Sequence, residues 1–479
     1  MVSFILPGNS ATGGYEVANS CRFDSASSDY LNRSLGTPSN RKIFTCSAWV
    51  KRASTGTYPI FWFGADSNNW FMVKYESDSL RVESKNSGST IIDVRTNALY
   101  RDFSAWYHVL VAVDTTQGTE SNRIKIYVNG VQETSFQTST YPSQDTDLNV
   151  ITEAEIGNQH TTQYFDGYMA EVVFVDGTAQ ANTDLGEFDE DSPNIWKPIS
   201  VSGLTFGTNG FYLDFKDSSS LGNDAAGSNN FTVNNIAAVN QHTDTCTNNF
   251  ATFNGALGYN STIVLAEGNI KGTTGSTHEA LYGSIFSSIG VTQGKWYAEF
   301  KVTTNSDKSI IGISADLESD ADGSSGSAFN FIYLGQGIGY YGNNGKIFHT
   351  NSNTQMTYGS SLSNNDIVGI ALDVDNQEVY FSINGTFQNS GNPASGSSKT
   401  GGVVNEGARN IFSTGTGTIF FAVADFDRDA TCAIEANFGG GSVSAISSGN
   451  SDANGYGNFE YSVPSGYYSL CTKNLAEYG

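Results

Sequence analysis

Hydrophobic and β-branched residues recur along the whole chain in short runs, many of which alternate with polar residues. Glycine, asparagine, aspartate and serine separate these runs, and clear examples lie at residues 45–52, 106–114, 295–304 and 366–375. Alternation with a period of two is typical of strands that bury one face. The sequence therefore predicts an all-β protein. The exception is the acidic stretch at 182–194, which is predicted to form one short helix.

Two turn sequences indicate that the strands form two separate sandwiches. Asn129–Gly130 and Asn384–Gly385 each follow an alternating run, and they lie in opposite halves of the chain. Asn-Gly supplies the two positive φ angles that a type I′ hairpin turn requires. We predict two antiparallel β-sandwich (jelly-roll) domains joined by a polar, asparagine-rich linker. The predicted parts are an N-terminal arm (1–14), a first sandwich (15–215), the linker (216–256) and a second sandwich (257–479).

Charge and cysteine content exclude several classes of protein. The 479 residues contain 24 Lys and Arg against 48 Asp and Glu, a net charge of −24. That balance excludes nucleic-acid binding through a broad basic surface and disfavours anionic glycans and membranes as ligands. The five cysteines are scattered without a CxxC pair, so we expect neither a disulfide framework nor a zinc site. The first residues fit neither a signal peptide nor a membrane anchor, and no membrane insertion is expected.

Ordered sets of short motifs in the two halves resemble two known families. The first half carries motifs at 21–24 with 29–31, 47–51, 106–109, 127–130, 156–157 and 165–172. This order resembles laminin-G-like, concanavalin A-type jelly rolls over about residues 15–178. The second half carries motifs at 294–300, 311–313, 368–373, 380–385, 420–423, 437–439 and 463–470. That order is similar to SPRY domains over about residues 257–475.

The pairing of these two domain types is similar to structural proteins of tailed bacteriophages, particularly marine ones. The resemblance implies a virion component made in the bacterial host cytoplasm, with other virion proteins as partners. It also implies a homo-oligomer, for which a trimer is the expectation, and the apolar start at residues 2–6 could serve as an anchoring arm or as a first strand. Tail-fibre and head-fibre positions both stay open.

Catalysis is not expected. One glycosidase family on concanavalin A-like folds carries its carboxylates as ExDxxE, and the nearest string here is EFDEDS at 187–192, where Ser192 replaces the last glutamate. No GxSxG or HExxH motif occurs, and His108 lies inside a predicted strand, where a structural role is expected. A Ser-His-Asp triad assembled from distant residues is not excluded by the sequence.

Calcium is the cofactor that the acidic stretches favour, although the prediction is that no cofactor is required. Laminin-G-like domains often hold calcium at the sandwich rim with hard oxygen ligands. The densest carboxylates suited to it are Asp425, Asp427 and Asp429. The alternative is ordinary turn acidity after a strand.

Carbohydrate binding is the activity that the aromatic and asparagine-rich stretches favour. Sugar rings stack on aromatic faces while amides in rim loops bind the hydroxyl groups. The predicted ligand-binding residues lie at 58–70 and 333–348: Trp62, Asn68, Asn69, Trp70, Tyr340, Tyr341 and Asn343. The alternative is that these rings belong to buried strands.

These observations lead to three functions, in order of preference. The first is a phage virion appendage with lectin-like domains that bind a host-surface glycan or receptor. The second is a purely structural protein that decorates the capsid or braces the tail. The third is a hydrolase of host polysaccharide.

Overall fold

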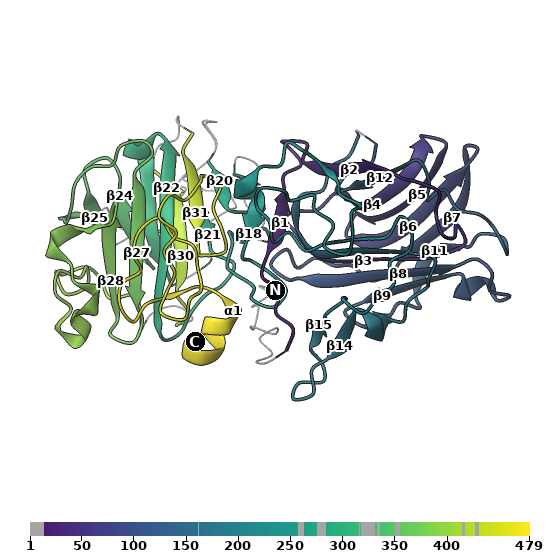
Figure 1. Cartoon of the computed structure of the whole chain (residues 1–479). Helices are drawn as coiled ribbons and strands as arrows, with labels where there is room; N and C mark the ends of the chain where they lie inside the picture. Colours follow the sequence, from purple (N-terminus) through teal and green to yellow (C-terminus); the bar gives the residue numbers. More distant parts are fainter. Residues whose placement is uncertain are drawn as a thin grey trace. The chain divides into compact units, whose positions relative to one another are not determined.

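The computed structural model describes residues 14–160, 162–256, 263–274, 284–315, 317, 331–332, 336–349, 355–413, 417–426 and 431–479. Contacts divide the chain into two compact units, one spanning residues 8–249 and one that contains residues 250–479. We call these units the first and second domains and describe each by itself (Figure 1).

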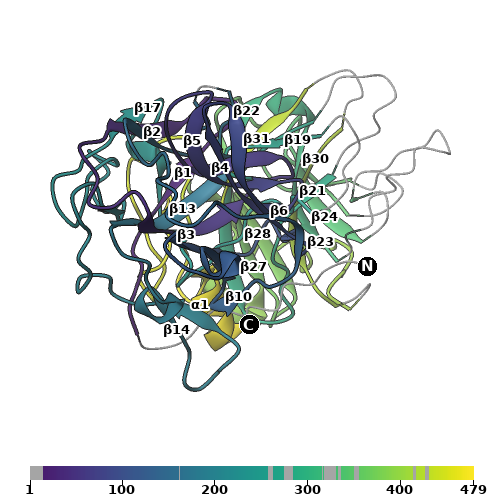
Figure 2. The ribbon, with the colours of Figure 1, turned by 90° about the vertical axis from the view of Figure 1, so that its right-hand side faces the viewer.

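Two eight-stranded antiparallel sheets form the first domain. Several of their strands, among them β3, β4 and β5, are labelled in Figure 2. Sheet A has the order β10-β9-β8-β3-β13-β1-β18, with β16 also paired to β13, and sheet B has the order β11-β7-β6-β5-β4-β12-β2-β17. The strands of sheet A are β1 (Ser20–Phe23), β3 (Ile43–Arg52), β8 (Tyr107–Asp114), β9 (Ile124–Val128), β10 (Val131–Gln132), β13 (Gly167–Asp176), β16 (Phe211–Leu213) and β18 (Gln241–His242). Those of sheet B are β2 (Tyr30–Ser34), β4 (Thr57–Asp66), β5 (Asn69–Glu76), β6 (Ser79–Asn86), β7 (Ser89–Thr96), β11 (Phe136–Thr140), β12 (Glu153–Ile156) and β17 (Thr232–Asn234).

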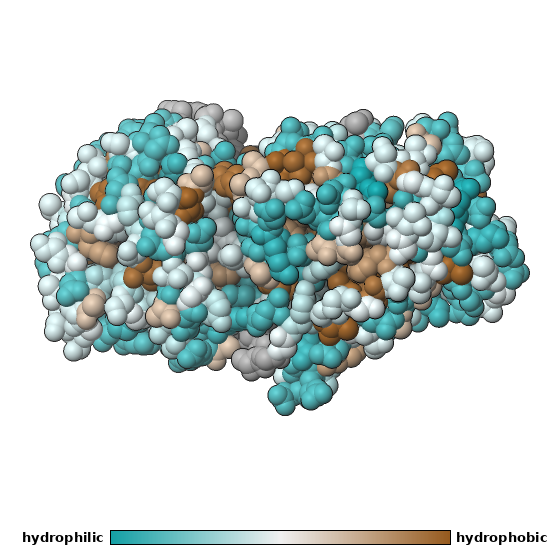
Figure 3. Space-filling model, in the orientation of Figure 1, coloured by the Kyte–Doolittle hydropathy of each residue, from teal (hydrophilic) through white to brown (hydrophobic). Residues whose placement is uncertain are grey.

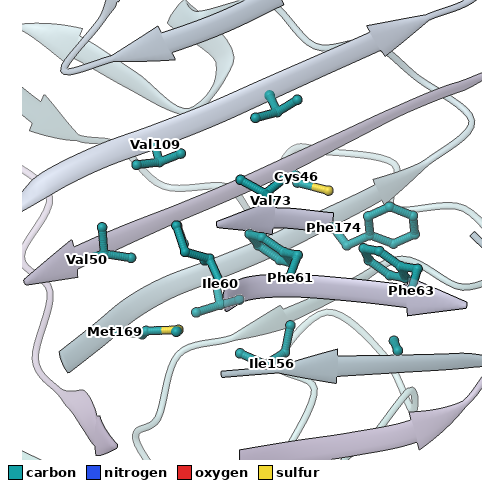
Figure 4. Close-up of a cluster of buried hydrophobic side chains, with 14 of the residues drawn as sticks. Cys46, Val50, Ile60, Phe61, Phe63, Val73, Val109, Ile156, Met169 and Phe174 are labelled. Carbon is teal, nitrogen blue, oxygen red and sulfur yellow. The ribbon is translucent and has the colours of Figure 1, made fainter. Parts of the chain in front are cut away.

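The core of the first domain lies between these two sheets. Alternate side chains of each strand point inward, so that both sheets contribute to one buried cluster. Figure 4 shows part of it, with side chains from sheet A (Cys46, Val50, Val109, Met169 and Phe174) and from sheet B (Ile60, Phe61, Phe63, Val73 and Ile156). Burial of this many aliphatic and aromatic groups is the main force that holds the sandwich together.

The segment predicted as a linker, residues 216–256, is for the most part an integral portion of the first domain. Strand β17 pairs with β2, and β18 pairs with β1. Phe231 and Ile236 are buried in the first core, while Val233 is exposed. The asparagine-rich composition therefore marks edge strands and turns, and the boundary between the domains falls after Asn249.

The acidic stretch at 182–194 is not the helix that its composition predicted. It forms the 3₁₀ turn η2 (Asn182–Asp184) and then enters the hairpin of β14 (Gly186–Phe188) and β15 (Trp196–Pro198), which extends from the first domain in Figure 1. Asp189 accepts hydrogen bonds from the backbone of Asp191 and Ser192, so local turn bonding replaces the helical pattern. The other 3₁₀ turns of this domain are η1 (Glu120–Asn122) and η3 (Ala238–Asn240).

The second domain is also a two-sheet sandwich. Sheet C has the order β19-β20-β31-β22-β27-β28-β29, with β32 parallel to β22, and sheet D has the order β21-β30-β23-β24-β25-β26. Sheet C contains β19 (Val264–Ala266), β20 (Lys271–Thr273), β22 (Lys295–Thr304), β27 (Ile367–Asp373), β28 (Glu378–Ile383), β29 (Thr386–Phe387), β31 (Ala433–Asn437) and β32 (Tyr468–Ser469). Sheet D contains β21 (Ser284–Phe286), β23 (Ser309–Ser314), β24 (Gly337–Tyr341), β25 (Lys346–Phe348), β26 (Gln355–Thr357) and β30 (Phe420–Asp425).

Short helical elements complete the second domain. The 3₁₀ turns are η4 (Ser306–Lys308), η5 (Gln388–Ser390) and η6 (Pro393–Ser398), and the single described α-helix is α1 (Thr472–Tyr478). No described helix has both the length and the apolar character needed to cross a membrane. The prediction of an all-β protein made of antiparallel sandwiches is thus confirmed.

Large exposed hydrophobic side chains are few among the described residues. They are Leu99, Val131, Phe188, Val233 and Val264. On the face shown in Figure 3, hydrophobic residues form small separate patches among hydrophilic ones. The five cysteines are all buried and free, consistent with the absence of a disulfide framework expected from their spacing.

Both Asn-Gly pairs form the predicted type I′ hairpin turns. Asn129 and Gly130 have φ of +47° and +78° between β9 and β10, and Asn384 and Gly385 have +48° and +79° between β28 and β29. Positive φ at both central residues defines this turn. The turns therefore set the register of one hairpin in each domain.

Replacing Gly130 by alanine is expected to destabilise the first domain more than the same change at Gly88. Both glycines have φ close to +79°, which costs an alanine roughly 1 kcal/mol. A Cβ at Gly130 would lie 2.2 Å from the Trp196 ring, whereas at Gly88 the nearest atom is 3.4 Å away. Overpacking should raise the loss for G130A to about 2–4 kcal/mol. Urea denaturation would measure both, and equal losses would contradict this account.

Candidate ligand-binding site

Four side chains form a continuous row across the outer face of sheet B. Asn32 lies opposite Glu155 across β2 and β12, Glu155 lies opposite Trp62 on β4, and Trp62 lies opposite Met72 on β5. Their neighbours Leu31, Ile156, Phe61 and Val73 point into the core. Because successive strand residues face opposite sides, the row must lie on the outer face.

An ion-pair network occupies the half of this face formed by β5, β6 and β7. Lys74 contacts Glu76 at 2.7 Å and Glu83 at 3.1 Å, and Arg81 contacts Asp93 at 2.8 Å. Arg81 and Arg95 also pair with Glu76. Each cation of the network is therefore neutralised within the sheet and offers no open site to an anionic ligand.

The other half of the face, on β2, β12 and β17, is aromatic and polar. We call it the tyrosine patch and define it as Tyr30, Asn32, Glu153, His160, Tyr164 and Asn234. The rings of Tyr30 and Tyr164 lie 6.1 Å apart between centroids, and both are partly exposed. Asn234 donates to Asn32 Oδ1 at 2.9 Å, and Asn32 donates to Glu153 Oε1 at 2.8 Å. This chain fixes the amide and carboxylate groups beside the rings.

Glu155 anchors the loop that borders the tyrosine patch. It is 3% exposed, and its Oε2 accepts the backbone N–H of His160 at 2.7 Å. The His160 ring stacks on Trp62, with 5.0 Å between centroids and 20° between planes. Burial raises the pKa of Glu155 to about 7, while the His160 N–H bond opposes the shift and Glu153 adds to it. Glu155 thus holds His160 in place over the tryptophan.

The predicted stacking role of Trp62 and Trp70 is wrong. Trp62 is 1% exposed and Trp70 is 5% exposed, and they pack with Met72. The His160 ring covers Trp62, and the Lys85 ammonium lies 5.6 Å from the Trp70 ring centroid. Neither indole therefore presents a face to a sugar.

Asn68 lies in the turn between β4 and β5, and Asn69 is the first residue of β5. Asn68 is exposed, whereas Asn69 is partly buried. Asn69 donates to Asp66 Oδ1 at 3.0 Å and accepts the Ser87 N–H at 3.0 Å. Its amide therefore stabilises the turn.

Tyr340 and Tyr341 are also buried, contrary to the predicted stacking role. Tyr340 has no exposed surface and belongs to the main core of the second domain. Tyr341 packs on Phe348 and Phe426 with ring centroids 5.0 and 4.9 Å apart. Asn343 is exposed in the turn between β24 and β25. The two predicted stacking rings, Tyr340 and Tyr341, thus belong to buried clusters on opposite faces of β24.

The calcium prediction falls largely outside the described residues, which do not include Asp427 and Asp429. Asp425 is buried at the end of β30, opposite Ser309. Within the part of the chain that the structure describes, Glu153, Glu155 and His160 bring ligand atoms within 4.8 Å of one another. Because Glu155 already accepts the His160 N–H, this group has the geometry of a loop anchor.

A buried Ser-His pair in sheet A does not have the geometry of a catalytic triad. Ser47 Oγ lies 2.8 Å from His108 Nε2, and the Trp196 indole donates to His108 Nδ1 at 3.0 Å. Since Nδ1 accepts, a neutral His108 carries its proton on Nε2 and donates it to Ser47, the reverse of a general base. Burial lowers the pKa of His108 to about 3, which keeps the ring neutral. His108 is therefore structural, as its place in a strand predicted.

Sequence reasoning missed every residue of the tyrosine patch. The alternation in 30–33 and 153–156 was a usable signal, because Tyr30, Asn32, Glu153 and Glu155 occupy one face of each strand. Asn234 could not be found in this way, since it lies 202 residues from Asn32 in a segment predicted as linker.

Comparisons with known proteins support the two domain types. Residues 25–183 match the family model described as the concanavalin A-like lectin/glucanases superfamily, and residues 295–403 match the SPRY domain model. The chain therefore carries a concanavalin A-like domain followed by a SPRY domain. No curated protein matches the chain.

Three solved structures are similar to parts of the chain. The SPRY domain of human HERC1 is 16% identical, with a TM-score of 0.26, covering 37% of this chain and 92% of that one. A putative carbohydrate binding protein from Bacteroides ovatus is 17% identical, with a TM-score of 0.30, covering 46% and 59%. A heptameric SAP-like pentraxin from Limulus polyphemus is 15% identical, with a TM-score of 0.28, covering 36% and 82%. Neither family model bears on the resemblance to phage structural proteins, which stays a prediction.

Proposed function

We propose that the first domain is a lectin-like module that binds a neutral, hydroxyl-rich ligand at the tyrosine patch. One observation carries the proposal: two partly exposed tyrosine rings lie beside hydrogen-bonded amides and a carboxylate on one sheet face. Aromatic rings stack on the C–H faces of sugars, while amide and carboxylate oxygens accept hydroxyl protons. None of the six residues that define the patch is a lysine or an arginine, and the chain carries a charge of −24. Both features disfavour sulfated or phosphorylated ligands.

The proposal extends to the setting in which this module acts. The order of a concanavalin A-like domain and a SPRY domain is similar to virion structural proteins of tailed phages, and it supports an appendage of tail-fibre or head-fibre type. A single patch of two rings would bind in roughly the millimolar range. A virion displaying a homo-oligomer, of which a trimer is the expected form, would gain strength from many copies.

Binding to immobilised glycans tests the proposed ligand class. The full chain, tethered in multiple copies on beads, should bind neutral glycans in preference to sulfated ones. The double variant Y30A/Y164A should lose about tenfold or more of this binding, since roughly 1.4 kcal/mol corresponds to a factor of ten. Y30F/Y164F, which keeps both rings, should retain most of it.

The matched control is Y127A, which removes a partly exposed tyrosine from sheet A. Unchanged binding by Y30A/Y164A, or a preference for sulfated glycans, would overturn the lectin proposal and favour a purely structural role. Antibody labelling of particles addresses the setting separately, because a protein absent from purified virions is not an appendage.

A further inference from the structure

A pocket in the second domain lies on the outer face of sheet C, away from every residue predicted as a site. Its volume is about 250 Å³. Strands β22, β27 and β31 form its floor, and the segments at 442–447 and 460–461 form its walls. The SPRY match ends at residue 403, so both walls come from chain beyond it. We call this the strap pocket.

The floor of the strap pocket holds a buried carboxyl group. Glu299 is 2% exposed and lies opposite Asn437 on β31. Its Oε1 accepts the Tyr297 hydroxyl at 3.0 Å and the Tyr461 N–H at 2.9 Å, and its Oε2 accepts the Glu460 N–H at 2.9 Å. These bonds fix the wall at 460–461 against the sheet, so the pocket is a built feature of the fold.

The charged groups that line the pocket are unbalanced. Lys301 lies opposite Glu435 in the strand register and donates to Ser444 Oγ at 3.0 Å, and Ser444 donates to Glu435 Oε2 at 2.6 Å. Glu460 accepts the Ser447 N–H at 2.7 Å. Besides Glu299, which the donors on the floor already hold, the carboxylates of Glu435 and Glu460 share the pocket with one ammonium group. This excess of negative charge favours a second cation.

Apolar lining accompanies these charges. Ile367 contributes apolar surface to the floor, and Ile446 and Tyr461 contribute it to the walls. Hydrocarbon walls beside carboxylates suit a ligand with a methylene stem and a charged head, because the stem packs while the head pairs. A bare metal ion would make no favourable contact with the apolar walls. A neutral sugar would not compensate the excess negative charge of the carboxylates.

We propose that the strap pocket binds the cationic end of a basic side chain, an arginine guanidinium above all, presented by a partner polypeptide. The planar guanidinium offers five N–H donors and fits carboxylate pairs better than an ammonium group does. The volume admits one such side chain and excludes a folded segment. This site does not depend on the lectin proposal, since all of its residues lie in the second domain.

Calorimetric titration of the full chain with N-acetyl-arginine amide tests this site. N-acetyl-citrulline amide is the matched probe, since it has the same shape without the charge. The arginine compound should bind and the citrulline compound should bind at least about tenfold more weakly. Equal binding, or no heat from the arginine compound at tens of millimolar, would overturn the proposal.

Substitutions of the pocket residues are expected to change the affinity for the arginine probe in opposite directions. E435Q and E460Q should each weaken binding of the arginine probe by about fivefold to tenfold, because one pocket anion is lost. K301Q should tighten it, because the competing cation is removed while a donor for Ser444 remains. The control is E406Q, at an exposed glutamate of the same domain outside the pocket. If K301Q weakened binding as much as E435Q did, the affinity would not depend on the charge of the pocket, and the proposal would be wrong.

Discussion

Replacing Lys51 by methionine is expected to lower the free energy of unfolding of the first domain by about 3–5 kcal/mol. Lys51 Nζ pairs with Asp244 Oδ2 at 2.8 Å, and the two side chains are 1% and 3% exposed. Asp244 Oδ1 also accepts the Trp106 indole N–H at 3.1 Å. Without the ammonium group, the Asp244 carboxylate keeps the Trp106 donor but loses the Lys51 charge in a buried setting. Urea denaturation of the full chain, followed by tryptophan fluorescence, would measure the loss.

Two further variants separate the buried charge from the loss of a side chain. K42M removes a lysine that pairs with Asp145 at 3.6 Å, with side chains 33% and 61% exposed, and should cost less than about 1 kcal/mol. The double variant K51M/D244N should recover part of the K51M loss, because no charge is then left unpaired. A K51M protein as stable as wild type would show that residues 242–249 are not fixed to β3.

This ion pair also shows why the extent of the first domain could not be predicted from the sequence. The stretch at 216–249 has the polar composition of a linker, and its two strands are only two and three residues long. Its place is decided by tertiary partners: β17 adds to β2, Asp244 neutralises Lys51, and Phe231 enters the core. None of these partners is close in sequence. In contrast, the Asn-Gly turns and the alternating strands were predicted correctly because their causes are local.

The candidate site shows the same contrast between local features, which the sequence predicts, and tertiary contacts, which it does not. Strand alternation predicted that Trp62 and its neighbours Phe61 and Phe63 point to opposite faces, but not that His160 covers the outer face. The tyrosine patch joins strands whose partners lie up to 202 residues apart. A sequence shows which residues face outward from a strand, whereas what lies over them depends on the loops that the fold brings there.

A second large effect on stability is expected from pH, because the carboxyl groups of Glu155, Glu171 and Glu299 are buried. Burial is the leading cause that raises the pKa of Glu155, Glu171 and Glu299 to about 7. In the unfolded chain these groups release their protons near the ordinary value of 4.5. Their contribution to stability is therefore complete below pH 4.5 and is lost as the pH rises through 7. Each shift corresponds to roughly 3 kcal/mol.

In the first domain a histidine acts in the opposite direction. Burial lowers the pKa of His108 from 6.5 to about 3. Its contribution is therefore complete above pH 6.5 and is lost as the pH falls toward 3. Between pH 4.5 and 6.5, the folded domain binds two protons at these groups, on Glu155 and Glu171, whereas the unfolded chain binds one, on His108. The folded state therefore binds one proton more. The first domain should accordingly be most stable near pH 4.5–5 and lose on the order of 4 kcal/mol by pH 7.5.

The variant E171Q isolates one of these groups. Glu171 is 6% exposed and accepts the Tyr212 hydroxyl at 2.8 Å and the Tyr15 hydroxyl at 3.2 Å. Glutamine keeps an acceptor for these donors and cannot ionise, so the loss between pH 4.5 and 7.5 should shrink to roughly 1 kcal/mol. E120Q makes the same change in net charge at an exposed residue and should leave the wild-type slope. Urea denaturation at half-unit pH steps would measure the free energy of unfolding of the wild type and both variants. A wild-type stability that rises from pH 5 to 7.5 would show that Glu155 and Glu171 are ionised in the fold.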